Sequence, residues 1–354
     1  MKTSERLSLI KSFAEEIVTE EELAQLFEGK KHPIAYDGFE PSGKIHIAQG
    51  IMRAINVNKM TKAGVKFTML AADWHAWANN KLGGDLDKIH TVGDYYIEVW
   101  KATGMDLENV KFARSTDLVS KQEYWQTVLK IARESTVNRI LRCSQIMGRS
   151  ESETLSAAQI FYPCMQCADI FHLKADITQL GMDQRKVNIL AREVGPKLGF
   201  GKPVIVSHHM LMGLGEPKET GLTGVERAIA MKMSKSNPDS AIFMTDSAEE
   251  VDRKIKKAYC PEGQATDNPI LEYMRHMIFE KFKAVEIKRP EKFGGNATFE
   301  SYSQLENAFV NKKLHPMDLK NAAAGYVNEM LEPVRKHFEK NAKARKLLEQ
   351  VNSM

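Results

Sequence analysis

Short apolar runs that alternate with longer stretches of helical spacing constrain the fold of this chain most. The runs cover residues 34–38, 67–72, 110–113, 176–180 and 204–207. Helical patterns lie between them, for example at 47–62, 121–135 and 157–173. Strands that alternate with helices predict an α/β fold with a parallel sheet covered on both faces. Such sheets bind ligands at the carboxyl ends of their strands, so we expect the site in the loops after the first, second and fourth runs.

The alternation ends near residue 247, where we predict a domain boundary. Residues 1–28 carry apolar side chains at roughly helical spacing among acids and are predicted as an N-terminal helical segment. Residues 29–246 form the predicted domain with the parallel sheet, a Rossmann-like arrangement of strands and helices. Residues 247–354 are rich in lysine and arginine and are predicted to form a mostly helical domain.

Composition excludes several classes of protein. The 354 residues are 43% hydrophobic and 27% charged, and only four are cysteines, which is ordinary for a globular protein in a reducing compartment. No run of eighteen apolar residues predicts a membrane span. The acid-rich start is wrong for a targeting peptide, so we expect a cytoplasmic enzyme. A net charge of +4 permits nucleic acid as a partner without requiring it.

The first motif covers residues 36–49 and links a predicted strand to a predicted helix. Gly38 to Lys44 has the spacing of a phosphate loop, but Ile45 stands where magnesium binding needs serine or threonine. A helix start with an imidazole on its first turn, His46, could instead face a triphosphate. A plain strand–turn–helix would use the same residues as turn and cap.

The second motif, residues 231–238, places Lys232 and Lys235 on a loop that ends in proline. Two lysines in such a loop could close over a phosphate chain and stabilise a leaving pyrophosphate. A solvated basic loop is the simpler interpretation of this motif alone. Both motifs together, in this order and on the expected loops, are far more specific than either.

The third motif lies on the helix predicted at 157–173. Tyr162, Gln166 and Asp169 are spaced by four and three residues, so they share one helix face. Cys164 and Cys167 form a single CxxC in the same helix, which is weak evidence for zinc or redox chemistry without a second pair. Pro163, just before them, would suit a reactive pair at a helix N-terminus.

Taken together, these motifs resemble those of class I aminoacyl-tRNA synthetases. Residues 46–49 correspond to the HIGH signature and 232–236 to the KMSKS signature. Over nearly the whole chain the sequence is most similar to tyrosyl-tRNA synthetases of the archaeal and eukaryotic type, particularly at 36–46, 72–75, 162–169, 181–186 and 315–320. Ala48 and Gln49 replace the usual Gly-His, and Gln49 can donate a hydrogen bond but carries no charge.

The resemblance implies a tyrosine–tRNA ligase that forms tyrosyl-adenylate from ATP and then transfers tyrosine to tRNA(Tyr). It implies catalytic roles for His46, Gln49, Lys232 and Lys235. The implied tyrosine-binding residues are Tyr36, Gly38, Glu40, Ala72, His75, Tyr162, Gln166, Asp169 and Gln184. The implied ATP-binding residues are Ser42, Gly43, His46, Asp183, Lys232, Ser234 and Lys235. ATP would come with Mg²⁺ but without a dedicated protein-bound metal.

For tRNA, the resemblance implies that Arg185 and Lys186 read the acceptor stem and that Phe293, His315 and Asp318 read the anticodon. Stacking on an unpaired base suits an aromatic side chain. Without the resemblance, Phe293 would be a packed aromatic at a turn, and His315 to Asp318 a helix start. A homodimer without membrane attachment is also implied. The alternatives are a tryptophanyl-tRNA synthetase, a small-molecule nucleotidyltransferase and a non-catalytic RNA-binding relative.

Overall fold

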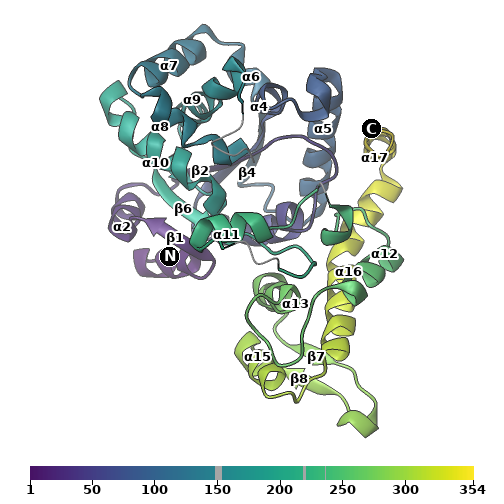
Figure 1. Ribbon diagram of the computed structural model, residues 1–354. Helices are drawn as coiled ribbons and strands as arrows, with labels where there is room; N and C mark the ends of the chain where they lie inside the picture. Colours follow the sequence, from purple (N-terminus) through teal and green to yellow (C-terminus); the bar gives the residue numbers. More distant parts are fainter. Residues whose placement is uncertain (148–153, 218–220, 236) are drawn as a thin grey trace.

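A six-stranded sheet forms the centre of the computed structural model, which describes residues 1–147, 154–217, 221–235 and 237–354 (Figure 1). The strands are β1 (Ala14–Val18), β2 (Ile34–Phe39), β3 (Lys66–Ala71), β4 (Val110–Arg114), β5 (Ile177–Thr178) and β6 (Val204–His208). Their order is β1-β6-β5-β2-β3-β4, and every neighbouring pair is parallel except β1 with β6. Each predicted apolar run coincides with a strand, which confirms the predicted parallel sheet.

The prediction of a helical segment over residues 1–28 is wrong for residues 14–18, which form a strand. The segment forms α1 (Thr3–Lys11), then β1, then α2 (Glu20–Gly29). β1 pairs with the edge of the sheet, with Ile17 opposite Val206. The acidic residues of β1 obscured the strand pattern in the sequence. They form ion pairs with residues that are distant in the sequence: Glu15 lies 3.4 Å from His209, and Glu16 lies 2.8 Å from Arg185. Tertiary pairing therefore overrode the local helical spacing.

Helices cover both faces of the sheet because alternate strand residues point to opposite sides. Ala35, Phe67 and Met69 pack with α3 and α5 in one core, while Tyr36 and Leu70 pack with α7, α9 and α10 in the other. The helices up to residue 240 are η1 (Ala48–Met52), α3 (Arg53–Lys62), α4 (Asp73–Ala78), η2 (Lys81–Gly84), α5 (Leu86–Ala102), α6 (Thr116–Val119), α7 (Gln122–Arg133), α8 (Val137–Leu141), η3 (Ser144–Met147), α9 (Ala157–His172), η4 (Met182–Gln184), α10 (Arg185–Val194), η5 (Pro196–Leu198), α11 (Gly224–Met231) and η6 (Pro238–Ser240).

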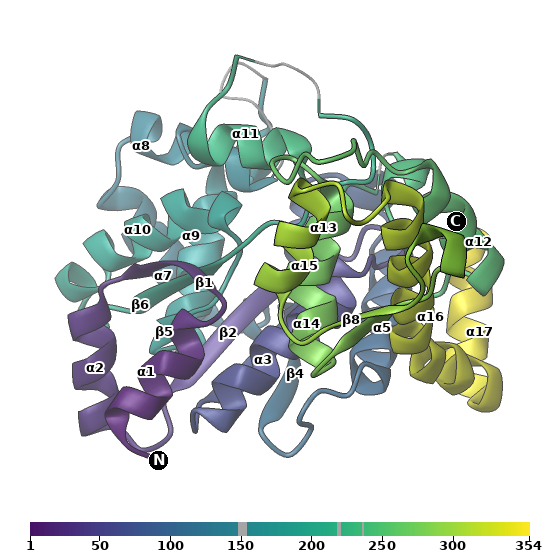
Figure 2. The same cartoon turned by 90° about the horizontal axis from the view of Figure 1, so that it is seen from below.

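The C-terminal part is mostly helical, as predicted, and adds one small hairpin. Its elements are α12 (Ala248–Lys257), α13 (Pro269–Tyr273), η7 (Met274–Ile278), α14 (Phe279–Lys281), β7 (Val285–Ile287), η8 (Glu291–Phe293), β8 (Ala297–Phe299), α15 (Tyr302–Val310), α16 (Pro316–Lys340) and α17 (Ala342–Asn352). α17 returns to pack beside α5 (Figure 1), and Figure 2 shows α13, α15 and α16 from below. Ser247, at the predicted boundary, caps α12, and the division into domains stays a prediction. None of the helices in the described ranges has the length and apolar character needed to cross a membrane.

Candidate active site

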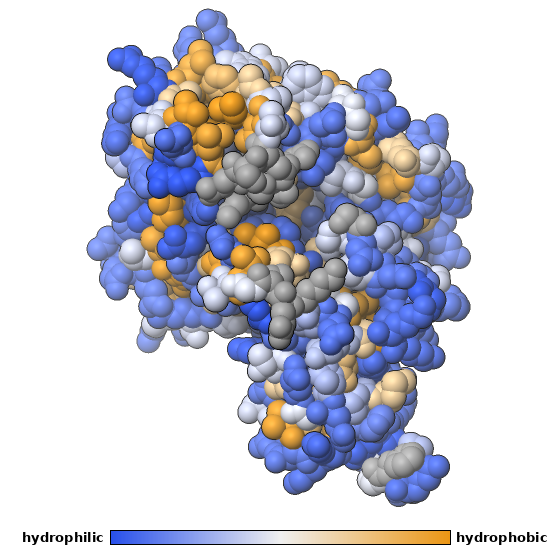
Figure 3. Space-filling model, viewed as in Figure 1, coloured by the Kyte–Doolittle hydropathy of each residue, from blue (hydrophilic) through white to orange (hydrophobic). Residues whose placement is uncertain are grey.

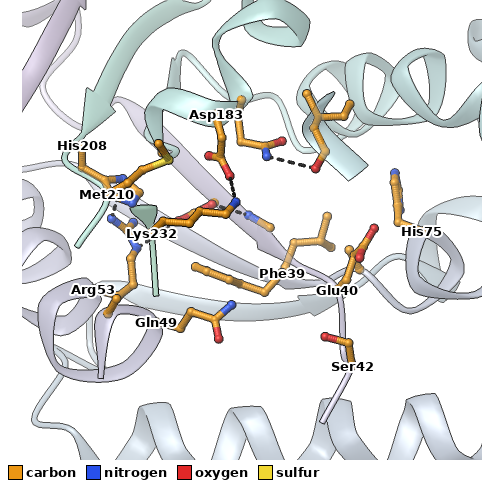
Figure 4. Close-up of a pocket in the computed structure, with 18 of the residues that line it drawn as sticks. Phe39, Glu40, Ser42, Gln49, Arg53, His75, Asp183, His208, Met210 and Lys232 are labelled. Atoms are coloured by element: carbon orange, nitrogen blue, oxygen red, sulfur yellow. Dashed lines mark hydrogen bonds and ion pairs between the residues drawn. The ribbon is translucent and has the colours of Figure 1, made fainter. Parts of the chain in front are cut away.

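A cavity of about 670 Å³ lies at the carboxyl ends of β2, β3, β5 and β6. The loops after β2, β3 and β5 contribute to it, as predicted, and so does the segment after β6. Figure 4 shows Arg53 and His208 on one side of the cavity and Glu40 and His75 on the opposite side. Lys232 extends between them and points toward Asp183.

Most of the residues predicted for tyrosine and ATP line this one cavity. They are Tyr36, Gly38, Glu40, Ser42, His46, Gln49, Ala72, His75, Tyr162, Gln166, Asp169, Asp183, Gln184, Lys232, Ser234 and Lys235. Gly43 is not part of the lining, and Ser236 of the KMSKS signature lies outside the described residues. The structure therefore brings together side chains that are up to nearly 200 positions apart in the sequence.

Asp169 is held at the bottom of the cavity by two buried side chains. Tyr124 donates its hydroxyl to Asp169 Oδ1 at 2.8 Å, and His75 Nε2 lies 3.1 Å from Asp169 Oδ2. Burial opposes the charged form of His75, but the Asp169 carboxylate outweighs it and raises the pKa of His75 above its ordinary value. Asp169 comes from α9, whose start is fixed by the Ser156–Gln159 capping box. The predicted sharing of one face by Tyr162, Gln166 and Asp169 is confirmed by their common place in the cavity lining.

Tyr36 presents a buried hydroxyl beside this carboxylate. The residue is 1% exposed, and its Oη has no hydrogen-bond partner at normal geometry among the described residues. Burial, followed by the nearby Asp169 charge, raises the pKa of Tyr36 well above its ordinary value, so the group remains a neutral phenol. A buried polar group without a partner costs free energy, so this end of the cavity suits a ligand with a hydroxyl of its own.

Amide and carboxylate groups surround the next part of the cavity. Gln166 Nε2 donates to Gln184 Oε1 at 3.1 Å, and Gln184 Nε2 donates to the Ile146 carbonyl at 3.3 Å. Glu40 accepts from Asn79 Nδ2 at 3.0 Å and lies 3.5 Å from Lys81 Nζ. Asn79 and Lys81 follow α4, the helix after β3, and no local motif in the sequence predicted that they contact Glu40.

Three nitrogen-bearing side chains, those of His46, Lys232 and Lys235, lie close to one another in the cavity lining. Lys232 Nζ donates to Asp183 Oδ2 at 2.7 Å. Lys235 Nζ contacts Tyr96 Oη and lies 3.3 Å from Ser42 Oγ, and burial lowers the pKa of Lys235 to about 7. Burial, with the nearby Lys235 and Lys232, also holds the pKa of His46 well below its ordinary value, so its imidazole is neutral.

Two glycines allow the turn and helix that carry the HIGH signature. Gly43 has a φ of +123°, a conformation that side chains with a Cβ rarely adopt. A Cβ on Gly50 would lie 2.3 Å from Met244 Sδ, so any other residue there would force the Met244 side chain to move. The strand–turn–helix predicted from residues 36–49 is present, but its helix begins at Ala48, so His46 precedes the first turn and pairs with Phe243 in a short bridge. The His46 side chain lines the cavity.

A buried ion-pair network in the cavity lining was not predicted. Arg53 Nε lies 2.9 Å from Asp37 Oδ2, and both side chains are nearly inaccessible. Arg53 also contacts His208 Nδ1 at 3.1 Å. Burial raises the pKa of Asp37 to about 7, although the Arg53 charge opposes the shift. Asp37 sits inside the first motif, but its partners come from α3 and β6, and local spacing carries no signal for that pairing.

The residues predicted to contact tRNA lie outside the cavity lining. Arg185 and Lys186 begin α10, and Arg185 Nε lies 2.8 Å from Glu16 Oε2 on β1. His315 caps α16, because its Nδ1 accepts the Met317 N–H at 3.1 Å, and Asp318 lies in the first turn. Phe293 ends η8 just before Gly294, whose φ is +98°; the Phe293 side chain lies outside what the structure describes. The helix start and the turn expected without the resemblance are both present.

The CxxC does not lie at a helix N-terminus. α9 begins at Ala157, so Pro163, Cys164 and Cys167 are all inside the helix. Both thiols are buried and free, and burial raises the pKa of Cys164 to about 12 and that of Cys167 well above its ordinary value. Thiols with raised pKa values are poor nucleophiles, so the arrangement that the redox interpretation needed is absent here.

Comparison with known proteins agrees with this geometry. Residues 28–332 match the family described as tRNA synthetases class I (W and Y). The chain is 51% identical to the cytoplasmic tyrosine–tRNA ligase 1 of Arabidopsis thaliana over 98% of its own length and 88% of that protein. It is 42% identical to a tyrosine–tRNA ligase of Saccharolobus islandicus, with 99% of each chain covered. The tyrosyl-tRNA synthetase of Pyrococcus horikoshii, solved with L-tyrosine, superposes over 100% of both chains with a TM-score of 0.92 and 38% identity. The chain therefore belongs to the class I tRNA synthetases, and within them to the family of the tyrosine–tRNA ligases.

Proposed function

We propose that this protein is a tyrosine–tRNA ligase whose cavity binds tyrosine next to ATP. The observation that carries the proposal is the polarity of the cavity. The unpartnered Tyr36 hydroxyl and the Asp169 carboxylate lie in the part formed by β2 and α9, while His46, Lys232 and Lys235 bring cationic or donor groups together in another part of the lining. A phenol at one end and a phosphate chain at the other match these two parts.

The amino-acid part of the site distinguishes tyrosine through its hydroxyl. The tyrosine phenol would donate to Asp169 and accept from Tyr36, which satisfies both buried groups. Tyr162, Gln166 and Gln184, with Glu40 nearby, would bind the α-amino group, and Gly38, Ala72 and His75 complete the walls. An indole offers a donor but no hydroxyl, so this arrangement does not favour tryptophan. Phenylalanine would leave Tyr36 and Asp169 without partners and would be rejected.

The chemistry needs positioning and charge more than proton transfer. The tyrosine carboxylate oxygen attacks the α-phosphorus of ATP, and the bond to the β-phosphate oxygen breaks, which releases pyrophosphate with its negative charge. The carboxylate is already a nucleophile, so no general base is required. His46 and Gln49 can donate hydrogen bonds, and Lys232 and Lys235 can neutralise the charge that grows on the leaving group. The terminal hydroxyl of tRNA then attacks the tyrosyl carbonyl and releases AMP.

The cavity's carboxylates suit the ligands better than a resident metal. Each of the four that line it has a basic partner: Asp37 pairs with Arg53, Glu40 with Lys81, Asp169 with His75, and Asp183 with Lys232. The described residues hold no group of metal-ligating side chains that would form a cage. In this proposal, magnesium enters as part of the ATP substrate, bound through its phosphates. Asp183 would contact the ribose hydroxyls, and Ser42, Gly43 and Ser234 would border the nucleotide.

A homodimer is part of the proposal. Several large apolar side chains are exposed on neighbouring helices: Trp125 and Leu129 on α7, Val137 on α8 and Phe161 on α9. Figure 3 shows apolar residues gathered over these helices, at the upper left. Exposed apolar clusters often mark interfaces between subunits. Sedimentation velocity would test this, since a species of the 40.0 kDa chain alone would contradict it. We also keep the cytoplasm as the expected compartment, as for the Arabidopsis relative named cytoplasmic.

The experiment that tests the function is exchange of labelled pyrophosphate into ATP with tyrosine, phenylalanine or tryptophan. Exchange with tyrosine alone supports the proposal and the role of Tyr36 and Asp169. Exchange with tryptophan would overturn the assignment of the amino acid. No exchange with any of the three would favour a non-catalytic RNA-binding relative, which the complete cavity argues against.

ATP affinity is expected to fall as pH rises above neutrality, because Lys235 must be protonated to bind phosphate. Its pKa of about 7 in the free protein rises when the phosphates stabilise the ammonium, so binding takes up a proton. The Kd should increase by at most about tenfold per pH unit between about pH 7.5 and 9. Calorimetry in buffers of different ionisation enthalpy measures both quantities. A Lys235→Met variant should lose the proton uptake, and an unchanged wild-type Kd over this range would contradict the assignment.

Anticodon recognition is expected to depend on Arg289, which connects the two segments predicted to bind the anticodon. Arg289 Nε donates to the Gly295 carbonyl at 2.9 Å, just after Phe293, and its Nη1 donates to the Lys313 carbonyl at 2.9 Å, just before His315. Arg289→Ala should raise the KM for tRNA about tenfold, since two charge-assisted hydrogen bonds hold the segments together. Aminoacylation assays measure this.

Pyrophosphate exchange is the control for Arg289→Ala, because it does not require tRNA and should remain unchanged. Arg345→Ala serves as a second control, since Arg345 is exposed on α17 and donates to the Glu339 carbonyl nearby. An equal loss of both activities in Arg289→Ala would show a general structural defect and contradict the anticodon role.

A further inference from the structure

The segment after β6 forms a short antiparallel pair with the KMSKS loop. Met212 lies opposite Lys232, flanked by bonds from the Met233 N–H to the Leu211 carbonyl at 2.9 Å and from the Gly213 N–H to the Met231 carbonyl at 3.0 Å. In this pattern the two facing residues do not bond to each other. The N–H and carbonyl of Met212 therefore point away from the loop and need partners elsewhere.

Two consecutive residues of α13 supply those partners. Glu272 Oε2 accepts the Met212 N–H at 2.9 Å, and Tyr273 Oη donates to the Met212 carbonyl at 3.2 Å. Tyr273 is fully buried, and burial raises its pKa well above the ordinary value, so it remains a donor. His209 Nε2 lies 3.2 Å from Glu272 Oε2 and holds the carboxylate in place. α13 thus occupies the position that a third strand would take beside Met212.

The same stretch of chain also reaches the HIGH signature. η7 continues directly from α13 and packs against η1, which follows His46. Met274, Met277 and Ile278 of η7 are fully buried in the large core that also contains Ile51 and Met52 of η1. The chain from 269 to 278 therefore contacts the segments that carry both sets of predicted phosphate-binding side chains.

We propose that Glu272 and Tyr273 are positioning residues for Lys232, through the peptide of Met212. The inference rests on the proposed function, because it gives Lys232 a role on the ATP phosphates. Lys232 Nζ lies 2.7 Å from Asp183 Oδ2. The position of the Lys232 backbone sets how far its flexible side chain reaches. Residues that fix this backbone keep the ammonium where charge develops on the leaving pyrophosphate. Glu272 and Tyr273 come from the predicted helical C-terminal domain, so this domain contributes to the activation step.

Tyr273→Phe is the first test, since it removes one hydroxyl and keeps the buried ring. The rate of tyrosyl-adenylate formation in a single turnover should fall about 3- to 10-fold, as for the loss of one hydrogen bond. The Kd for tyrosine should not change, because Tyr36 and Asp169 are untouched. Glu272→Leu should lower the rate similarly, whereas Glu272→Gln keeps an acceptor for the Met212 N–H and should stay near wild type. Tyr326→Phe is the matched control, because its hydroxyl accepts the distant Glu286 N–H at 2.8 Å.

A double variant separates positioning from general stability. If Tyr273 acts through Lys232, Tyr273→Phe should cause no further loss of rate in a Lys232→Ala background. An equal loss in both backgrounds, or a wild-type rate in both Tyr273→Phe and Glu272→Leu, would overturn the proposal. Wild-type protein that does not exchange pyrophosphate with tyrosine would instead refute the proposed function. Thermal melting of each variant will show whether Tyr273→Phe is unstable. In that case the variants of Glu272, which is partly exposed, provide the same test at a second site.

Discussion

Lys235→Ala is expected to slow tyrosine-dependent pyrophosphate exchange about 10²- to 10³-fold, the effect of removing one preorganised charged donor from a transition state. The side chain reaches the cavity from the KMSKS loop and lies 3.3 Å from Ser42 Oγ, beside Tyr96. It is therefore placed at the end where the phosphates would lie. Because the contact strengthens as pyrophosphate leaves, kcat should fall much more than the affinity for ATP.

Tyrosine affinity distinguishes this loss from misfolding. The Kd for tyrosine should stay at the wild-type value in Lys235→Ala, since no contact of Asp169 or Tyr36 is changed. Lys88→Ala is the matched control, because this exposed lysine pairs only with Asp85 at 3.5 Å among the contacts described. An exchange rate of Lys235→Ala within about threefold of the wild-type rate would be a smaller loss than one hydrogen bond contributes. This result would contradict a role of Lys235 at the phosphates.

Asp169→Asn should have the second large effect, on the choice of amino acid. The carboxylate accepts from Tyr124 and pairs with His75, so its remaining acceptor capacity is directed into the cavity. Asparagine keeps the shape but presents an amide donor to the tyrosine hydroxyl, and it leaves His75 without its carboxylate. We expect kcat/KM for tyrosine to fall about 100-fold, the cost of a lost bond to a charged group. The value for phenylalanine, which has no hydroxyl, should change little.

Pyrophosphate exchange with each amino acid measures this ratio. Asp117→Asn, an exposed carboxylate on α6, is the control and should leave both values unchanged. A parallel loss for tyrosine and phenylalanine would show that Asp169 supports the fold of the cavity and does not read the hydroxyl.

The strands could be predicted because their signals are local, whereas most of the residues expected in the site were named through the resemblance to class I aminoacyl-tRNA synthetases. An apolar run of buried strand length is visible within the run itself, and Tyr162, Gln166 and Asp169 share a face because helical geometry repeats every few residues. The acids of β1 carried the opposite signal. Glu15 and Glu16 made the segment resemble a solvated helix, whereas they pair with His209 and Arg185, which follow β6 and β5, the two strands nearest to β1 in the sheet.

The partners of the site residues could not be predicted in the same way. Tyr124 supports Asp169 from α7, Arg53 neutralises Asp37 from α3, and Glu272 holds Met212 from the C-terminal part. Each of these contacts joins residues that are separated in sequence and carry no shared spacing. The same holds for the pKa of Lys235, which depends on burial against Tyr96 and Ser42, a property of the assembled cavity.

By itself, the sequence of this protein determined the parallel sheet and the mostly helical C-terminal part, and it marked the two segments that we propose bind the phosphates. Periodicity and turn chemistry act over a few residues, and the sequence contains them completely. Only the tertiary structure decided that β1 joins the sheet edge, that the cavity's carboxylates are each paired, and that α13 binds the strand beside Lys232. These features depend on burial and on distances between segments far apart in the chain, which are fixed only when the whole core has packed.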